Sequence, residues 1–79
     1  MINVKLFGVL RLRSGIKECD LDAAKVKDVY PQLESLCGGK VSAKEFKTCI
    51  VMVNGTQKGA GAKLNDGDKI TLLTPASGG

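Results

Sequence analysis

Apolar and polar residues alternate at the start of the chain, in the segment INVKLFGVL at residues 2–10. The alternation places Ile2, Val4 and Leu6 on one face of an extended segment and Phe7 on the opposite face. A period of two with one apolar face is typical of a half-buried strand. The pattern therefore predicts a first strand whose core-facing side carries the three aliphatic residues.

A second alternating segment follows a turn. The turn lies in RLRSG, residues 11–15, where Ser14-Gly15 is the local signal. Residues 16–21, IKECDL, alternate again, and we expect Cys19 and Leu21 to face the core. The first two segments are thus predicted to pair as a hairpin.

Helical spacing replaces the alternation from residue 26 onward. One stripe at this spacing contains Val26, Val29, Tyr30, Leu33, Leu36 and Cys37. Gly38-Gly39 follows, where a helix commonly ends in a left-handed residue. Pro31 would cost about 3 kcal/mol deep inside a helix, but little in the first turn. The sequence predicts either a helix that begins near Lys27 or Asp28, or a kinked helix.

A shorter helix and a third strand are predicted next. Ser42 and Glu45 have capping-box spacing, with Ser42 as the N-cap and Glu45 reaching back, which predicts a helical turn over residues 43–47. Residues 48–53, TCIVMV, indicate a strand. Because this strand is apolar on both faces, we expect it either inside the sheet or under a partner.

The remaining elements are short and punctuated by turns. Asn54-Gly55 is a strong hairpin signal and predicts a return strand at residues 56–58. A glycine-containing loop at 59–61 and a turn at 65–68 precede a last strand, KITLLT, at 69–74. Pro75 has no amide hydrogen and is expected to end the pairing.

This order of elements predicts an α+β fold. One mixed sheet of about five strands would be covered on one face by one main helix, with a short second helix beside it. The 79 residues suffice for one domain. We assign residues 1–75 to that domain and residues 76–79 to a flexible tail.

Composition narrows the class of partner. The chain is 43% hydrophobic and 25% charged, and its longest apolar run is far shorter than a membrane span. No signal-peptide pattern is found, so we expect a cytoplasmic protein and no membrane partner. The net charge of +4 is spread along the chain beside only three aromatic residues, which argues against nucleic acid as the main partner.

Catalytic and metal chemistry is largely excluded by residue types. The chain contains no histidine, so neither a Ser-His-Asp nor a Cys-His arrangement is available. Cys19, Cys37 and Cys49 are widely spaced and form no CxxC pair, which argues against a zinc site. We expect reduced thiols that act as small buried hydrophobic residues, with no bound metal or cofactor.

The tail suggests a chemistry that another protein would catalyse. Gly78 and Gly79 lack side chains and can thread a narrow channel. A free carboxylate is a poor electrophile, so an enzyme would have to activate Gly79, most simply as an acyl-adenylate made with ATP. Sulfide or persulfide would then give a thiocarboxylate, and an amine would give an amide. A chance glycine pair at an unstructured end is the alternative.

The last sixteen residues, LNDGDKITLLTPASGG, resemble the end of the ubiquitin-like sulfur carriers. That family includes the small subunit of molybdopterin synthase, the thiamine sulfur carrier and the archaeal small modifier proteins. The shared pattern is a Leu-x-Asp-Gly-Asp turn, a hydrophobic strand, a proline-containing segment and Gly-Gly. The opening Ile2-x-Val4-x-Leu6-Phe7, followed by a small residue and Arg11, is similar as well.

The resemblance implies a β-grasp fold and activation by an adenylating enzyme of the ubiquitin-activating type, leaving a thiocarboxylate on Gly79. Many molybdopterin-type members have two aromatics and two prolines before the tail, where this chain has Leu72-Leu73 and Thr74-Pro75. Pro75 nevertheless favours that branch over the thiamine carrier.

A docking surface is also implied by this fold, in which the first and last strands are parallel neighbours. Phe7 and Leu73 would then lie together on the open face beside the root of the tail, with Val51 or Met52 joining them. Residues expected to contact partners are Phe7, Leu73, Pro75, Ala76 and Ser77. Arg11 and Arg13 flank the predicted turn and could pair with an acidic partner surface or remain solvated.

Three functions follow as hypotheses. The first is a sulfur carrier for molybdenum or tungsten cofactor synthesis, donating sulfur to a pterin precursor in a larger partner subunit, the molybdopterin synthase large subunit. The second is a ubiquitin-like protein modifier joined to target lysines through Gly79, and a thiamine-pathway sulfur carrier is an alternative to the first. The third is an interaction module whose Gly-Gly is incidental.

Overall fold

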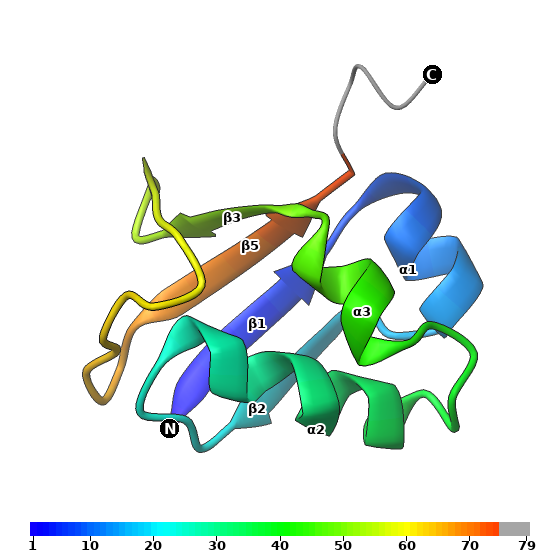
Figure 1. The fold of residues 1–79 in the computed structure, drawn as a ribbon, viewed down its shortest axis with the longest axis horizontal. Coiled ribbons are helices and arrows are strands. Elements are labelled where there is room, and N and C mark those ends of the chain that lie inside the picture. The colour runs from blue at the N-terminus through cyan, green and yellow to red at the C-terminus, as the bar shows by residue number, and fades with distance from the viewer. Residues whose placement is uncertain (75–79) are drawn as a thin grey trace.

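The computed structural model describes residues 1–74 and shows one mixed sheet with helices on one side (Figure 1). In chain order the elements are β1 (Ile2–Leu6), α1 (Gly8–Ser14), β2 (Glu18–Leu21), the 3₁₀ turn η1 (Val26–Asp28), α2 (Val29–Leu36), α3 (Ala43–Lys47), β3 (Ile50–Val53), β4 (Thr56–Gln57) and β5 (Lys69–Leu73). The predicted α+β class and mixed sheet are confirmed.

The sheet has the strand order β2-β1-β5-β3-β4. The two central strands come from opposite ends of the chain and run parallel, with Leu6 beside Leu72. The other neighbouring strands are antiparallel. The predicted parallel pairing of first and last strands is therefore confirmed, as is the position of β3 inside the sheet.

The segment after β1 differs from the sequence-based prediction. Residues 8–10 were expected to continue the strand and residues 11–15 to form a turn, but Gly8–Ser14 is the helix α1. Gly8 has a positive φ of 60°, which turns the chain out of the sheet. Leu10 and Ser14, one helical turn apart, are both buried. Residues 1–74 therefore contain three α-helices where the sequence predicted two.

The predicted position of Pro31 is confirmed. Helix α2 begins at Val29, so the proline is its third residue, where an amide hydrogen has no partner within the helix. At the other end, the Gly38 amide donates to the carbonyl of Ser35 at 3.1 Å and the Gly39 amide donates to that of Glu34 at 2.9 Å. These two bonds form a Schellman motif and end the helix at the predicted glycines.

Helix α3 begins at the predicted N-cap. The hydroxyl oxygen of Ser42 accepts a hydrogen bond from the Glu45 amide at 3.2 Å. The carboxylate of Glu45 makes an ion pair with Arg13 of α1. Glu45 thus connects the N-cap Ser42 of α3 to helix α1.

The tight turn between β3 and β4 is the predicted hairpin. Asn54 and Gly55 have φ values of 51° and 85°, as a type I′ turn requires. The side chain of Asn54 also donates to Asp68 at 2.9 Å and accepts from the Lys69 amide at 3.0 Å. These bonds fasten the hairpin to the start of β5.

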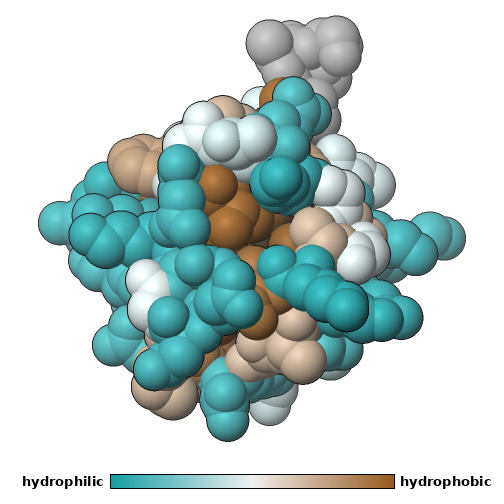
Figure 2. Space-filling view, turned by 90° about the vertical axis from the view of Figure 1, so that its left-hand side faces the viewer, coloured by the Kyte–Doolittle hydropathy of each residue, from teal (hydrophilic) through white to brown (hydrophobic). Residues whose placement is uncertain are grey.

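The core lies between the sheet and the helix layer of α2 and α3 (Figure 1). Strand residues predicted to face it are buried, namely Ile2, Val4, Leu6, Leu21, Ile70 and Leu72. Phe46 of α3 is the largest side chain with no measurable exposure. Figure 2 shows a mostly hydrophilic side of the molecule, where hydrophobic side chains surface only in a narrow strip.

Replacing Phe46 by Ala is expected to destabilise the domain by about 3–5 kcal/mol, because it leaves a cavity in the core. That is a large part of the roughly 5–15 kcal/mol by which domains are stable. Phe46→Leu should cost roughly 1–2 kcal/mol. Urea unfolding followed by circular dichroism measures both. Leu36→Ala, at a position 56% exposed, is the control and should change stability by about 0.5 kcal/mol or less.

Candidate functional site

The root of the tail is the end of β5. Strand β5 ends at Leu73, and Thr74 is exposed directly after it. Thr74 lies against the start of α1, since a Cβ built on Gly8 would stand 3.9 Å from its hydroxyl oxygen. The predicted reactive residues Gly78 and Gly79, and the predicted partner contacts Pro75, Ala76 and Ser77, lie outside the described residues.

The structure brings Phe7 and Leu73 together. Phe7 follows Leu6, which is the register partner of Leu72, and the Phe7 amide donates to the Leu72 carbonyl at 3.3 Å. Both residues follow a buried neighbour in extended backbone, so both side chains point away from the helix layer. Phe7 is 44% exposed. Their role in docking stays a prediction.

Strand β3 extends this apolar surface. Ile50 is the register partner of Leu73, and Met52 alternates with the buried Val51. Of the two residues considered from sequence, Met52 therefore lies on the open face and Val51 in the core. We call Phe7, Ile50, Met52 and Leu73 the open-face patch. Ile50 was not identified from sequence, because only the strand register places it opposite Leu73.

Helix α1 adds two exposed apolar residues that the sequence analysis missed. Val9 is 55% exposed and Leu12 is 81% exposed. They are three positions apart and so lie on the same side of the helix, away from the buried Leu10. The sequence signal that could have predicted this helix is the pair Gly8 and Gly15, which mark its two ends.

The two arginines of α1 lie in different surroundings. Arg11 lines a hollow with Phe7, Lys5 and Lys17, in which Glu18 is the one acidic residue. This hollow has an excess of positive charge beside the open-face patch. It suits an acidic partner surface, as the sequence analysis considered for Arg11.

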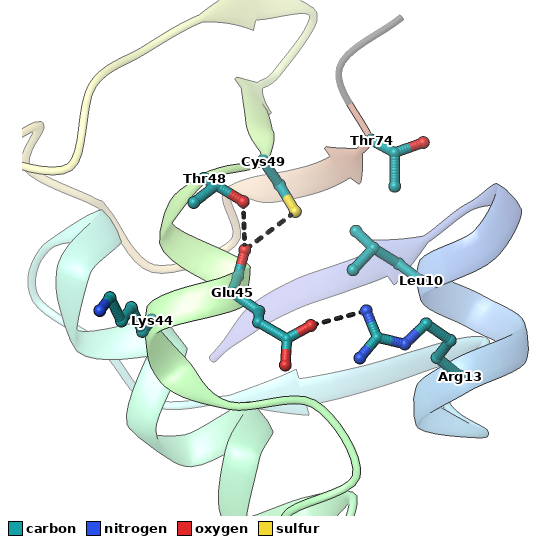
Figure 3. Close-up of a pocket in the computed structure, with 7 residues that line it drawn as sticks. All are labelled: Leu10, Arg13, Lys44, Glu45, Thr48, Cys49 and Thr74. Carbon is teal, nitrogen blue, oxygen red and sulfur yellow. Dashed lines mark hydrogen bonds and ion pairs between the residues drawn. The ribbon is translucent and has the colours of Figure 1, made fainter. Parts of the chain in front are cut away.

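Arg13 is neutralised within the chain. Its guanidinium lies 2.6 Å from the carboxylate of Glu45. Figure 3 shows this pair at one side of a second hollow, which Leu10, Lys44, Thr48, Cys49 and Thr74 complete. The hydrogen bond from Arg13 is the main reason that the pKa of Glu45 is lowered, with a smaller contribution from Ser42. The tail root therefore lies between the basic hollow around Arg11 and a hollow in which Glu45 neutralises Arg13 but Lys44 remains charged.

The thiols are not activated. Burial is the main cause of the raised pKa of Cys49, whose Sγ also lies 3.5 Å from the Glu45 carbonyl oxygen. Burial likewise raises the pKa of Cys19, followed by the charges of Asp20 and Glu18. Both are therefore protonated at neutral pH and are poor nucleophiles. This agrees with the expectation of structural thiols.

Residues 1–74 contain no group of three potential ligands that could hold a metal ion. No helix in the described part of the chain is long and apolar enough to cross a membrane.

The chain is similar to known proteins along nearly its whole length. A sequence model described as the ThiS family matches residues 4–79. No curated protein matches. Among solved structures, small archaeal modifier protein 1 from Methanosarcina acetivorans is 28% identical with a TM-score of 0.78, covering 99% of this chain and 95% of that one.

Two further structures have comparable similarity. SAMP1 from Haloferax volcanii is 26% identical with a TM-score of 0.76, covering 99% of this chain and 98% of that one. The Amycolatopsis orientalis BexX/CysO complex contains a chain that is 25% identical with a TM-score of 0.74, with full coverage of both chains. These neighbours have the ubiquitin-like β-grasp fold, so the predicted fold is confirmed.

The ion pair between Arg13 and Glu45 predicts a pH-dependent stability difference. The pKa of Glu45 is lower in the folded protein than its ordinary 4.5. The pair therefore stabilises the fold above the unfolded-state pKa, and this stabilisation is lost as the pH falls through the folded-state pKa. Wild type should be more stable than Glu45→Gln at neutral pH, and the two should converge in acid.

Urea unfolding at neutral pH and at about pH 3 measures the difference. Arg13→Gln should show the same pH profile, and the double variant should lose little more than either single variant. A gap between wild type and Glu45→Gln that stays constant with pH would contradict this account.

Proposed function

The chain belongs to the ThiS family of ubiquitin-like sulfur carriers, and from that premise we propose that Gly79 is its reactive residue. A separate enzyme adenylates the Gly79 carboxylate, and sulfur then replaces one oxygen to give a thiocarboxylate. The observation that best supports this is the family match itself, which extends through the terminal Gly78-Gly79 pair.

The proposed chemistry balances without a catalyst in this chain. A carboxylate oxygen of Gly79 attacks the α-phosphorus of ATP, and pyrophosphate leaves. Hydrosulfide then attacks the acyl carbon, a C–S bond forms, AMP leaves and a proton is released. A protein persulfide can replace hydrosulfide if a thiol reduces the resulting acyl disulfide.

The surroundings of the tail root support a role as substrate and carrier. The sequence contains no histidine, and the two partly buried cysteines are held protonated. The neighbouring surface instead offers the exposed open-face patch and the basic hollow around Arg11. Such a combination of apolar and charged groups suits a protein partner.

We propose that the adenylating enzyme docks on the open-face patch. The patch lies next to Thr74, so an enzyme bound there would have the tail within reach. The similar chain in the BexX/CysO complex, which is itself bound to a partner, supports docking of this kind.

Three routes are open to the activated Gly79. In the first, the sulfur passes to a pterin precursor held by a larger partner subunit, as in molybdopterin synthesis. Pro75, at a position where molybdopterin-type chains have proline, supports this branch. A protein modifier is the second candidate, and the similarity to two archaeal modifier proteins favours it. The description of the matching family as ThiS supports a third candidate, a thiamine-pathway sulfur carrier. The same activated Gly79 serves each route.

The intact mass of the protein, isolated under denaturing conditions from its own cells, tests the activation step. We expect a second species heavier by the difference between sulfur and oxygen. Deleting Gly79 should remove that species without changing the melting temperature, because the buried core residues all lie between Ile2 and Leu72. Ser77→Ala, which keeps both glycines, is the control and should retain it. Loss of folding on deletion would overturn the proposal.

The modifier route leaves its own mark on target proteins. Since Lys69 is the last basic residue, trypsin would leave residues 70–79 attached to a modified lysine. A Ser77→Arg variant would shorten that remnant to Gly-Gly. Remnants of both lengths, each from its own strain, would establish conjugation. Their absence beside a thiocarboxylate species would favour transfer to a small molecule.

The docking proposal predicts separate effects for two exposed positions. Phe7→Asp should raise the KM of the adenylation reaction roughly thirtyfold, as expected when a central interface residue is lost. Leu36→Asp, at a similarly exposed position on α2, should leave the KM unchanged. Pyrophosphate release with the purified activating enzyme measures both. Equal KM values for the two variants would place docking elsewhere.

A further inference from the structure

A third hollow lies on the helix side of the molecule, away from the open-face patch. Its floor is apolar and is formed by Tyr30 and Pro31 of α2 and Ala43 of α3. Three lysines complete its lining, namely Lys27, Lys44 and Lys47. We call this feature the lysine groove. None of its lining residues is acidic.

The lysines of this groove are not neutralised by their neighbours. Among residues 1–74, the ion pairs join the amino terminus to Asp66 and Arg13 to Glu45. Figure 3 shows Lys44 pointing away from the Arg13–Glu45 pair. Glu34, the nearby acidic residue of α2, is turned to the Ala43 amide as a hydrogen-bond acceptor. Three like charges thus line one apolar hollow whose lining residues include no carboxylate, while Glu34 contributes one negative charge beside Ala43.

From this arrangement we propose that the lysine groove binds an acidic peptide segment of a partner protein. An apolar side chain of that segment would fill the hollow against Tyr30 and Pro31. Flanking carboxylates would pair with Lys27, Lys44 and Lys47 of its lining. Charge complementarity supplies orientation and specificity, while burial of the apolar side chain supplies affinity.

Size and composition favour a peptide over other anions. The hollow measures about 330 Å³, at the lower end of ligand pockets, and it is open, so it admits an apolar side chain better than a cofactor. Tyr30 is only 4% exposed, so its ring cannot stack with a nucleotide base. No arginine is present to hold phosphate by two hydrogen bonds.

This inference goes beyond the proposed function, because the groove and the open-face patch lie on opposite sides of the sheet, although Lys44 also lines the hollow beside Thr74. Helices α2 and α3 cover the side of the sheet opposite Phe7 and Leu73 (Figure 1). An acidic partner could therefore bind while an activating enzyme holds the open-face patch. Such a partner would recognise this chain, or targets joined to it, independently of the chemistry at Gly79.

Fluorescence anisotropy with the labelled peptide DDVIVEE tests the proposal on the full chain. We expect saturable binding that weakens with salt, and amide NMR shifts concentrated at Tyr30 and residues 43–47. The triple variant Lys27→Gln, Lys44→Gln, Lys47→Gln should bind roughly tenfold more weakly. The triple variant Lys58→Gln, Lys63→Gln, Lys69→Gln loses the same charge elsewhere and should bind as wild type.

Two altered probes check the chemistry of the ligand. The peptide NNVIVQQ lacks carboxylates and DDSSSEE lacks the apolar anchor, and neither should bind measurably. Deleting Gly79 should leave the affinity for DDVIVEE unchanged, which separates this proposal from the one for the tail. Equal weakening by both triple variants, or absence of binding by DDVIVEE, would overturn it. Tighter binding of polyuridylic acid at the same amides would replace it with a nucleic-acid site.

Discussion

The parallel pairing of β1 with β5 is the interaction on which the rest of the structure depends. It joins the first and last strands of the chain at the centre of the sheet, with Leu6 beside Leu72 and the Phe7 amide bonded to the Leu72 carbonyl. Both strands bury alternate residues under α2 and α3, so one register decides which side chains enter the core. A shift of β5 by one residue would move Leu73 inward and expose Leu72.

The same pairing gives the two faces of the sheet different roles. The helix side is filled by apolar residues from β1, β5, α2 and α3, including Phe46. The other side has no helix layer, and there Phe7, Ile50, Met52 and Leu73 remain exposed or half-buried beside the tail root. Since β5 is central, the chain leaves the sheet between α1 and β3. Thr74, the last described residue, therefore lies next to the surface on which we propose that another protein docks.

The charged residues also differ between the helix side and the open face of the sheet. Arg13 is paired with Glu45 and helps to join α1 to α3, whereas Arg11 lines the hollow beside Phe7. The two arginines are two positions apart, which in a helix turns them by about 200° relative to each other. Their separation into a structural and an exposed role follows from α1 being a helix. The lysine groove places further exposed positive charges on the helix side of the sheet.

Local patterns in the sequence determined most of the elements, and they suggested the chemistry that we propose for the tail. Alternation identified the first two strands, and a continuous apolar run identified β3. Pro31 located the start of α2, Gly38 and Gly39 located its end, and Asn54-Gly55 identified the hairpin, because each signal acts between near neighbours. Residues 8–14 could not be assigned in this way, since Val9, Leu10 and Leu12 fit a strand or a helix equally well. Burial of Leu10 and Ser14 under the sheet decided it. The tertiary structure alone placed Ile50 opposite Leu73, separated Arg11 from Arg13 and gathered Lys27, Lys44 and Lys47, because strand register and helix packing bring together residues that are distant in sequence.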